Sequence, residues 1–244
     1  MYDTRVFLGT CGFTYNHWKT VFYPLHLPKS KWFEYYVKWF NSVEINASFY
    51  RIPAIKTVQG WERRAPKEFC FAVKISRLIT HVRKLKNCEK EVDWYFSVFE
   101  PLRKKIGAVL IQLPPTMKYN PDRLYSFFHF LPQTYHFAFE FRNREWYREE
   151  TYQLLKDNAY SFCIHDMGEL KTDRIITSDT VYVRFHGFDS LYGGDYKIET
   201  LKNWANWIRE CLKSGKTVFA FFNNDISGFA VKNCLILKKL VGRL

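Results

Sequence analysis

The sequence predicts a single (β/α)8 barrel of the TIM type over residues 1–244, irregular at its sixth βα unit. Eight short apolar stretches occur along the chain, helix-like segments separate most of them, and the length is close to the ~250 residues typical of this barrel. No linker or sharp change in composition divides the chain, which favours one domain. The predicted strands cover residues 6–10, 43–46, 69–74, 108–112, 137–140, 161–165, 181–186 and 218–222.

Helical periodicity predicts the elements between these strands. The first, at 31–40, carries four aromatic residues at helical spacing, a pattern typical of core packing. Pro121 fits the first turn of one helix and Gly215 fits the C-cap of another. The connection at 167–179 has only a weak helical pattern, so the sixth unit is the irregular one. The remaining helices are predicted at 56–64, 91–105, 121–130, 149–157, 201–213 and 227–240.

Composition limits the class of protein. Hydrophobic residues make up 47% of the chain and aromatic residues 19%, which excludes a disordered chain. Lys plus Arg number 37 and Asp plus Glu 24, so the formal net charge is +13. This surplus favours a polyanion, a phosphorylated substrate or an acidic surface as partner, although a solvated basic surface explains it equally well.

The cysteines and the first residues bear on location. Six cysteines are scattered without a C-x-x-C pair, and most lie in apolar segments, which favours reduced thiols in a cytosolic protein. The first five residues lead directly into a strand without the apolar region of a signal peptide. No stretch reaches the ~20 apolar residues of a membrane span. We therefore expect a cytoplasmic protein without a membrane partner, and the oligomeric state stays open.

The predicted strand ends carry both acids and cations. Side chains two apart on a strand share a face, so Glu140 is in phase with Arg142, and Arg184 with His186. Buried charges are costly unless they are paired, so ion pairs that close the top of the barrel are the alternative to an active site. The candidate acids and bases are Glu44, Glu140, Asp166, Asp225, His165 and His186. The candidate cations are Lys74, Arg142 and Arg184.

Metal binding is an open alternative at these strand ends. Two carboxylates and a histidine could hold a divalent ion. No H-x-H or H-E-x-x-H spacing occurs, and cations lie on interleaved strands, so a metal is possible but not favoured and the cofactor stays unknown.

The loops after the strands add basic and glycine-rich segments. The loop after the third strand offers Arg77, His81, Arg83, Lys84 and Lys86. A Gly193-Gly194 pair follows the seventh strand, where this fold often binds phosphate, although an ordinary turn explains the pair as well. The candidate substrate-binding residues are Thr10, Asn46, Tyr50, Arg77, His81, Gln112, Arg142, Arg184, Tyr192, Gly194, Asn223 and Asn224.

At these strand ends the sequence resembles the YecE-like proteins, also called domain of unknown function 72. The resemblance spans nearly the whole chain in order, and it implies a TIM-like barrel without an established activity. The chain departs from the family pattern at Cys11, Phe13 and Glu145, where Ser, Trp and Ser are common. Cys11 suggests a thiol nucleophile, but no clear base lies beside it in the sequence. The matching segments are Gly9–Phe13, Phe22–Pro24, Val43–Asn46, Phe49–Tyr50, Pro53, Phe71–Lys74, Ser76–Arg77, Thr80–His81, Gln112–Pro115, Glu140–Arg142, Trp146, Tyr182–Gly187, Tyr192, Gly194, Tyr196, Phe222–Asp225 and Gly228.

These patterns favour an enzyme that acts on a phosphorylated or otherwise anionic substrate. Phosphoester hydrolysis, possibly of nucleic acid, is the first reaction expected, by analogy with barrel endonucleases. Sugar-phosphate isomerisation or lyase chemistry is one alternative, and a nucleic-acid-binding protein without catalysis is the other. The expected partner is thus an anionic small molecule or nucleic acid. The predicted catalytic residues are Glu44, Lys74, Glu140, Asp166, His186 and Asp225.

Overall fold

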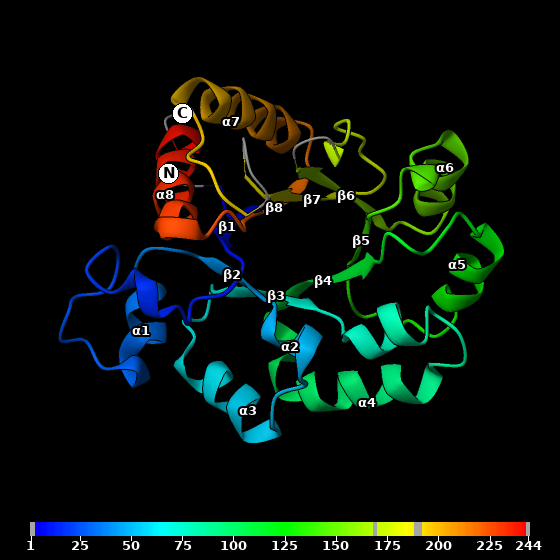
Figure 1. The fold of residues 1–244 in the computed structure, drawn as a ribbon, viewed down its shortest axis with the longest axis horizontal. Helices are drawn as coiled ribbons and strands as arrows, with labels where there is room; N and C mark the ends of the chain where they lie inside the picture. The colour runs from blue at the N-terminus through cyan, green and yellow to red at the C-terminus, as the bar shows by residue number, and fades with distance from the viewer. Residues whose placement is uncertain (1–2, 168–169, 188–191, 243–244) are drawn as a thin grey trace. The chain divides into compact units, whose positions relative to one another are not determined.

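The structure, a computed structural model, describes residues 3–167, 170–187 and 192–242 (Figure 1). Eight strands form one sheet in the order β1-β8-β7-β6-β5-β4-β3-β2, and β8 pairs with β1 in parallel. This is the α/β fold of the TIM-barrel type that the sequence predicts. The strands are β1 (Val6–Thr10), β2 (Ser42–Ile45), β3 (Cys70–Lys74), β4 (Ile106–Leu113), β5 (Phe137–Phe141), β6 (Ser161–Asp166), β7 (Thr180–Phe185) and β8 (Thr217–Phe222).

Helices and short helical turns connect the strands. The α-helices are α1 (Trp32–Tyr36), α2 (Ala47–Tyr50), α3 (Ile55–Arg64), α4 (Glu89–Phe99), α5 (Pro121–Phe128), α6 (Glu149–Asp157), α7 (Ile198–Lys213) and α8 (Phe229–Val241). The shorter turns are η1 (Asn16–Trp18), η2 (Lys29–Lys31), η3 (Leu78–Val82, a π-helix), η4 (Glu100–Lys105), η5 (Arg144–Trp146) and η7 (Ile226–Gly228).

Several predicted helix boundaries are wrong for local reasons. The helix predicted at 91–105 divides after Phe99, because Pro101 stands in the first turn of the 3-10 helix η4. The helix predicted to begin at Ser227 begins two residues later, because Ser227 and Gly228 both have positive φ. The irregular sixth connection is confirmed, since its described part, 170–179, contains no α-helix.

Contacts along the chain gather into two compact units. Unit 1 comprises Met1–Glu44, Ile164–Arg174 and Asp179–Leu244, and unit 2 comprises Ile45–Cys163 and Ile175–Ser178. Each has its own buried core. In unit 1 the ring of Tyr23 stacks on Trp32 with centroids 4.6 Å apart, and in unit 2 Phe141 stacks on Trp146 at 4.8 Å. The single domain expected from the sequence stays a prediction.

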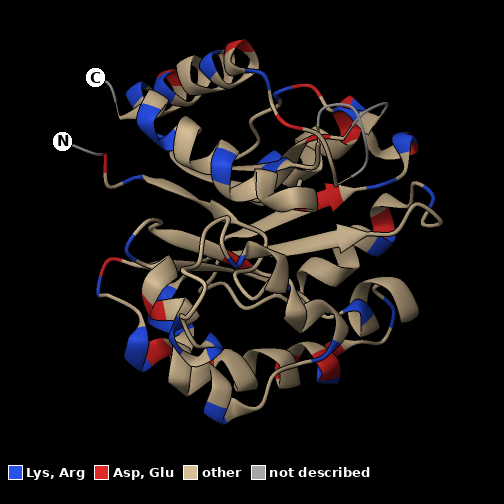
Figure 2. Cartoon of the chain, turned by 60° about the vertical axis from the view of Figure 1, so that its left-hand side comes forward, with Lys and Arg blue, Asp and Glu red and all other residues tan. Residues whose placement is uncertain are grey.

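Charge lies mainly on the outer elements. Figure 2 shows that Lys, Arg, Asp and Glu fall chiefly on helices and connections, whereas the strands are largely neutral. Within the described chain no helix combines the length and apolar character that a membrane crossing requires. All six cysteines are free thiols, as predicted.

Gly9 in β1 lies where two chain segments approach each other closely. A Cβ at this position would lie 2.1 Å from the carbonyl oxygen of Ser42 and 3.0 Å from the hydroxyl of Tyr36. That hydroxyl accepts a bond from the Thr10 backbone N–H at 3.0 Å and donates one to Ser42 O at 3.1 Å. Only glycine fits here, because the Cβ of any other residue would collide with the backbone carbonyl of Ser42.

We therefore expect Gly9→Ala to lower the free energy of unfolding by roughly 2–4 kcal/mol, the cost of forcing an atom into a closed contact. The measurement is urea unfolding followed by circular dichroism. Gly60→Ala is the matched control, because a Cβ at Gly60 in α3 meets nothing nearer than 3.8 Å. It should be neutral or stabilise by about 0.5–1 kcal/mol. Equal effects of the two substitutions would contradict the close approach.

Candidate active site

Several of the predicted site residues fall into two clusters, one in each unit, near the carboxyl ends of strands. We call the group in unit 1 the Glu44 cluster; it comprises Cys11, Glu44, Tyr182, Arg184 and His186. We call the group in unit 2 the Lys74 cluster; it comprises Lys74, Arg77, His81, Gln112, Glu140 and Arg142.

A buried, bidentate ion pair forms the centre of the Glu44 cluster. The guanidinium of Arg184 donates to Glu44 Oε2 from Nε at 3.0 Å and to Oε1 from Nη2 at 2.8 Å. The hydroxyl of Tyr182, which shares a face of β7 with Arg184, donates to Oε2 at 2.7 Å. Glu44 is 0% exposed and Arg184 1%. The pair thus links the end of β2 to β7. The Arg184 guanidinium, which the sequence suggests as a clamp for a substrate anion, instead binds the Glu44 carboxylate.

His186 continues the cluster towards β8. Nη1 of Arg184 lies 3.4 Å from His186 Nε2, and the amide of Asn223 lies 3.1 Å from Nδ1. Arginine can only donate, so Nε2 is the acceptor in the contact with Arg184, and the atom that Asn223 presents to Nδ1 is its amide nitrogen Nδ2.

Cys11 follows β1 and lies 3.6 Å from Nη2 of Arg184. Burial is the main cause that raises the pKa of its thiol, and the nearby Glu44 carboxylate raises it further. The thiol therefore stays protonated at neutral pH, a state that makes it a poor nucleophile.

Thr10 and Asp166 lie elsewhere in unit 1. The Thr10 hydroxyl donates to Gly12 O at 2.6 Å and lies 2.9 Å from the Tyr36 hydroxyl. Asp166, at the end of β6, is buried, and this burial raises the pKa of its carboxyl although Lys171 and Arg174 oppose the shift. The Thr10 hydroxyl is thus hydrogen-bonded to groups near the end of β1. Asp166, by contrast, is a buried carboxyl whose pKa is raised, a property that is common at functional sites.

Asp225 lines a pocket of about 420 Å³ in unit 1. Its carboxylate accepts from Trp18 Nε1 at 2.6 Å and pairs with His17 Nε2 at 2.9 Å. Burial raises the pKa of Asp225, and these two partners lower it. The other residues that line the pocket are Tyr15, Tyr192, Asn223, Ile226 and Ser227.

Hydrogen bonds from asparagine side chains hold the Gly193-Gly194 loop in place. Asn224 Nδ2 donates to Gly194 O at 2.9 Å and to Asn233 Oδ1 at 2.8 Å. Asn233 Nδ2 in turn donates to Asp195 Oδ1 at 2.7 Å. The Asn224 side chain thereby holds the loop, and a role for Gly194 and Asn224 in substrate binding stays a prediction. The ring of Tyr192 meets that of His186 edge-on at 5.7 Å.

The side-chain amide of Gln112 lies between the Lys74 ammonium and the Glu140 carboxylate. Lys74 Nζ donates to Gln112 Oε1 at 3.0 Å, and Gln112 Nε2 donates to Glu140 Oε1 at 3.1 Å. The ammonium can only donate and the carboxylate can only accept, so this orientation of the amide is the one that suits both. The same Oε1 forms an ion pair with Arg142, which directly follows β5 and, as its phase with Glu140 predicts, lies on the same side of the chain.

One phenylalanine joins Lys74 to His81. Lys74 Nζ lies 4.0 Å from the ring centroid of Phe49, and the His81 ring meets the same ring edge-on at 4.9 Å. Tyr50, the next residue, is 74% exposed and packs edge-on against Phe49 at 5.0 Å. Asn46 precedes α2, and its shielded Oδ1 has no hydrogen-bond partner in the described chain.

His81 shows the charge balance of this cluster. Its pKa is lowered to about 4, first by burial and then by the positive charges of Lys74, Arg77 and Arg142, while the Glu140 carboxylate acts in the opposite direction. Its Nδ1 lies 2.9 Å from the Thr80 hydroxyl. At neutral pH His81 is therefore an uncharged imidazole beside three cations and one carboxylate.

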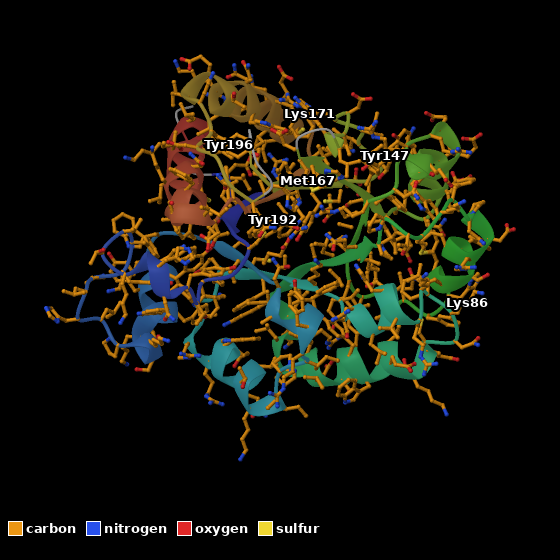
Figure 3. The ribbon with its side chains drawn as sticks, in the orientation of Figure 1. Lys86, Tyr147, Met167, Lys171, Tyr192 and Tyr196 are labelled. Atoms are coloured by element: carbon orange, nitrogen blue, oxygen red, sulfur yellow. The ribbon has the colours of Figure 1, made fainter. Side chains whose placement is uncertain are left out.

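One cation of the basic loop after β3 is paired with a carboxylate of the following helix. Arg83 donates from Nε and Nη2 to Glu91 Oε1, at 3.1 and 2.7 Å. Lys86 is exposed and lies at the outer edge of its unit in Figure 3. The described residues contain no group of three or more His, Cys, Asp or Glu side chains placed to hold a metal ion.

The sequence did not single out three residues that shape these clusters and the Gly193-Gly194 loop. Tyr182 was detectable from its phase with Arg184. Phe49 is adjacent to Tyr50 but reads as an ordinary core residue. Asn233 lies in α8 and carries no local signal, because its partners are distant in the sequence.

Comparison with known proteins adds a family to this geometry. Residues 7–244 match the family described as "Protein of unknown function DUF72". The chain is 30% identical to the UPF0759 protein YecE of Escherichia coli over 117 residues, 47% of this chain, and it spans only 42% of that curated relative. It is 26% identical to the UPF0759 protein YunF of Bacillus subtilis, over 86% of each chain. A DUF72 family protein of Thermotoga maritima has a similar solved structure, with a TM-score of 0.87, 31% identity, and coverage of 97% of this chain and 98% of that one.

We expect Glu44→Gln to lower the free energy of unfolding by about 3–5 kcal/mol, because it removes the carboxylate that pairs through two bonds with the buried Arg184 guanidinium. Tyr182→Phe is the matched smaller change: it removes one bond to the same carboxylate, at a cost of about 1.5–3 kcal/mol. Urea unfolding of both variants checks the order. A Glu44→Gln cost no larger than that of Tyr182→Phe would show that the pair is not the anchor of this cluster.

The low pKa of His81 sets a second expectation. As pH falls through about 6.5, the unfolded chain binds a proton at this histidine before the folded chain does, so the free energy of unfolding falls until the pH nears 4. His81→Gln should remove this contribution, whereas His136→Gln, at an exposed position, should retain it. Imidazole NMR titration with unfolding curves across this range provides the measurement. A His81 that titrates near 6.5 would refute the charge balance described above.

Proposed function

The chain belongs to the DUF72 family, whose function is unknown, and we propose that it is an enzyme that acts on a phosphorylated or otherwise anionic substrate. The proposal places substrate binding at the Lys74 cluster. Lys74, Arg77 and Arg142 lower the pKa of His81 and Glu140 raises it, and this grouping of cations near one imidazole is the observation that carries the proposal. A bound anion would neutralise the excess positive charge.

The members of the cluster suit different tasks. Arg77 is exposed and so can meet an arriving anion, and the Arg142 guanidinium lies at the end of β5 with its ion pair to Glu140 setting its direction. His81 is neutral at physiological pH, so it can accept a proton during the reaction. Binding and acid–base groups thus lie together.

Phosphoester hydrolysis is the first reaction to assay, with phosphomonoesters and phosphodiesters as substrates. Isomerase or lyase chemistry on a sugar phosphate is the second candidate, and Lys74 favours it, because an amine beside a neutral base suits chemistry at a carbonyl carbon. Catalytic roles for Glu44, Asp166, His186 and Asp225 in unit 1 belong to the same proposal and await the same assays.

Nucleic-acid binding without catalysis is supported by the net charge of +13 and the exposed ring of Tyr50. The distinguishing measurement is the salt dependence of duplex DNA binding. If Arg83, Lys84 and Lys86 contact phosphates, their joint neutralisation should flatten the log–log slope by roughly 0.9 for each lost contact. An unchanged slope would leave the small-substrate enzyme as the better hypothesis.

We expect inorganic phosphate to raise the pKa of His81 from about 4, because a bound anion offsets the repulsion from the three cations. Imidazole NMR titration with and without phosphate measures the shift. Arg77→Gln should diminish the response to phosphate, whereas Arg63→Gln, an exposed change in α3, should not. A His81 pKa that does not respond to phosphate would count against an anion site at this cluster.

A further inference from the structure

From a chain of hydrogen bonds at the pocket in unit 1, we propose that His17 is a general base for an uncharged substrate that contains a planar ring. The inference concerns unit 1 alone and goes beyond the anion site proposed at the Lys74 cluster. Asp225 is the centre of the chain: its Oδ2 pairs with Nε2 of His17 at 2.9 Å, and its Oδ1 accepts from the indole of Trp18 at 2.6 Å. A carboxylate that orients a histidine in this way is a common feature of acid–base sites.

The contacts of Nε2 assign the tautomer of His17. This nitrogen also lies 3.0 Å from the backbone carbonyl oxygen of Asp225, which can only accept a hydrogen bond, so Nε2 carries a proton. In the neutral imidazole the lone pair therefore lies on Nδ1, which has no hydrogen-bond partner among the described residues. The His17 side chain lines the pocket and is 47% exposed, so a ligand can reach that lone pair.

Asp225 is placed to position the histidine. Its side chain is only 17% exposed, and each of its carboxylate oxygens already has a partner within 2.9 Å. Its backbone carbonyl also accepts from the N–H of Gly228 at 3.0 Å, in the turn that leads into α8. The side chain and the main chain of Asp225 are thus both held, and together they fix the imidazole ring through Nε2.

Two residues that line the pocket have a costly backbone conformation, which is an observation independent of the hydrogen bonds. Tyr192 and Ser227 have φ of 63° and 62°, in the left-handed region that residues with a side chain seldom adopt. The N–H of Ile226 donates to Tyr192 O at 3.3 Å, so the segments that carry the two residues are joined at the pocket. Strain of this kind persists where the surrounding structure enforces it, and it is concentrated at functional sites.

The lining of the pocket indicates the class of substrate. Its volume of about 420 Å³ is in the range of small-molecule sites. Tyr15, Tyr192 and Ile226 supply aromatic and apolar surface. Of the described residues that line it, none is Lys or Arg, and Asp225 brings a carboxyl group, so the pocket is poorly suited to an anion. An uncharged ring compound suits it better, because its face can pack on a tyrosine ring while an acidic hydrogen meets Nδ1 of His17.

The probe is 5-nitrobenzisoxazole, an uncharged planar compound that reports on a base alone. Nδ1 of His17 takes the proton from C3 of the ring. The electron pair of the C–H bond becomes the third bond of a nitrile, and the N–O bond breaks with its electrons on oxygen. The coloured cyanonitrophenolate leaves, and the imidazolium returns its proton to water. Turnover by the full wild-type chain is compared with that by free imidazole at the same concentration.

We expect His17→Gln to lower kcat on the order of 10²-fold, the usual contribution of a positioned base. His26→Gln is the matched control, because His26 is an exposed histidine of the same unit, and it should leave kcat unchanged. Asp225→Asn should lower kcat on the order of tenfold and leave KM unchanged, because both partners of this side chain donate and an asparagine can accept from only one of them. Circular dichroism shows whether each variant is folded.

The outcomes separate this inference from the proposed function. A wild-type rate no higher than that of free imidazole, or an unchanged kcat in His17→Gln, would overturn the base and leave His17 and Asp225 as a surface ion pair only. A raised KM with unchanged kcat in Asp225→Asn would overturn the positioning role. Inhibition of the reaction by inorganic phosphate would overturn the uncharged substrate class. The anion site at the Lys74 cluster has its own readout, the response of His81 to phosphate, which His17→Gln leaves unchanged.

Discussion

A charge buried at the end of a strand loses its hydration, and it must be met by an opposite charge or by a dipole. The clusters satisfy this constraint in different ways. In the Glu44 cluster a carboxylate and a guanidinium match in two bonds, and a tyrosine hydroxyl adds a third. In the Lys74 cluster an amide stands between the ammonium and the carboxylate.

This difference separates structure from chemistry. In the bidentate pair, the guanidinium nitrogens that could bind a substrate anion are bonded to Glu44. The pair is therefore better suited to hold β2 and β7 together than to convert a ligand. The Lys74 cluster instead gathers like charges around a neutral imidazole, an arrangement costly for the folded chain unless a ligand relieves it.

The sequence predicts the barrel well, because apolar strands and intervening helices follow from local periodicity. Polar residues at strand ends can be identified equally well, and Glu140 and Arg142, which the phase rule places on one face, do form an ion pair. It does not reveal which charges meet across strands. That Arg184 faces Glu44, 140 positions away, depends on tertiary packing, as does the contact of Asn233 with Asn224. The π-helix after β3 also escapes prediction, because no simple periodic pattern marks a single turn of that kind.

The oriented amide of Gln112 also constrains how this protein can diverge. Its oxygen accepts from the Lys74 ammonium and its nitrogen donates to the Glu140 carboxylate. Reversing the charge of either neighbour would therefore leave the amide dipole wrongly oriented inside the protein. Replacing Lys74 alone leaves the amide oxygen without this donor, and replacing Glu140 alone leaves the amide nitrogen without this acceptor and removes one partner of Arg142. Substitutions on β3, β4 and β5 should therefore arise in concert, and three positions distant in the sequence should be inherited as one correlated unit.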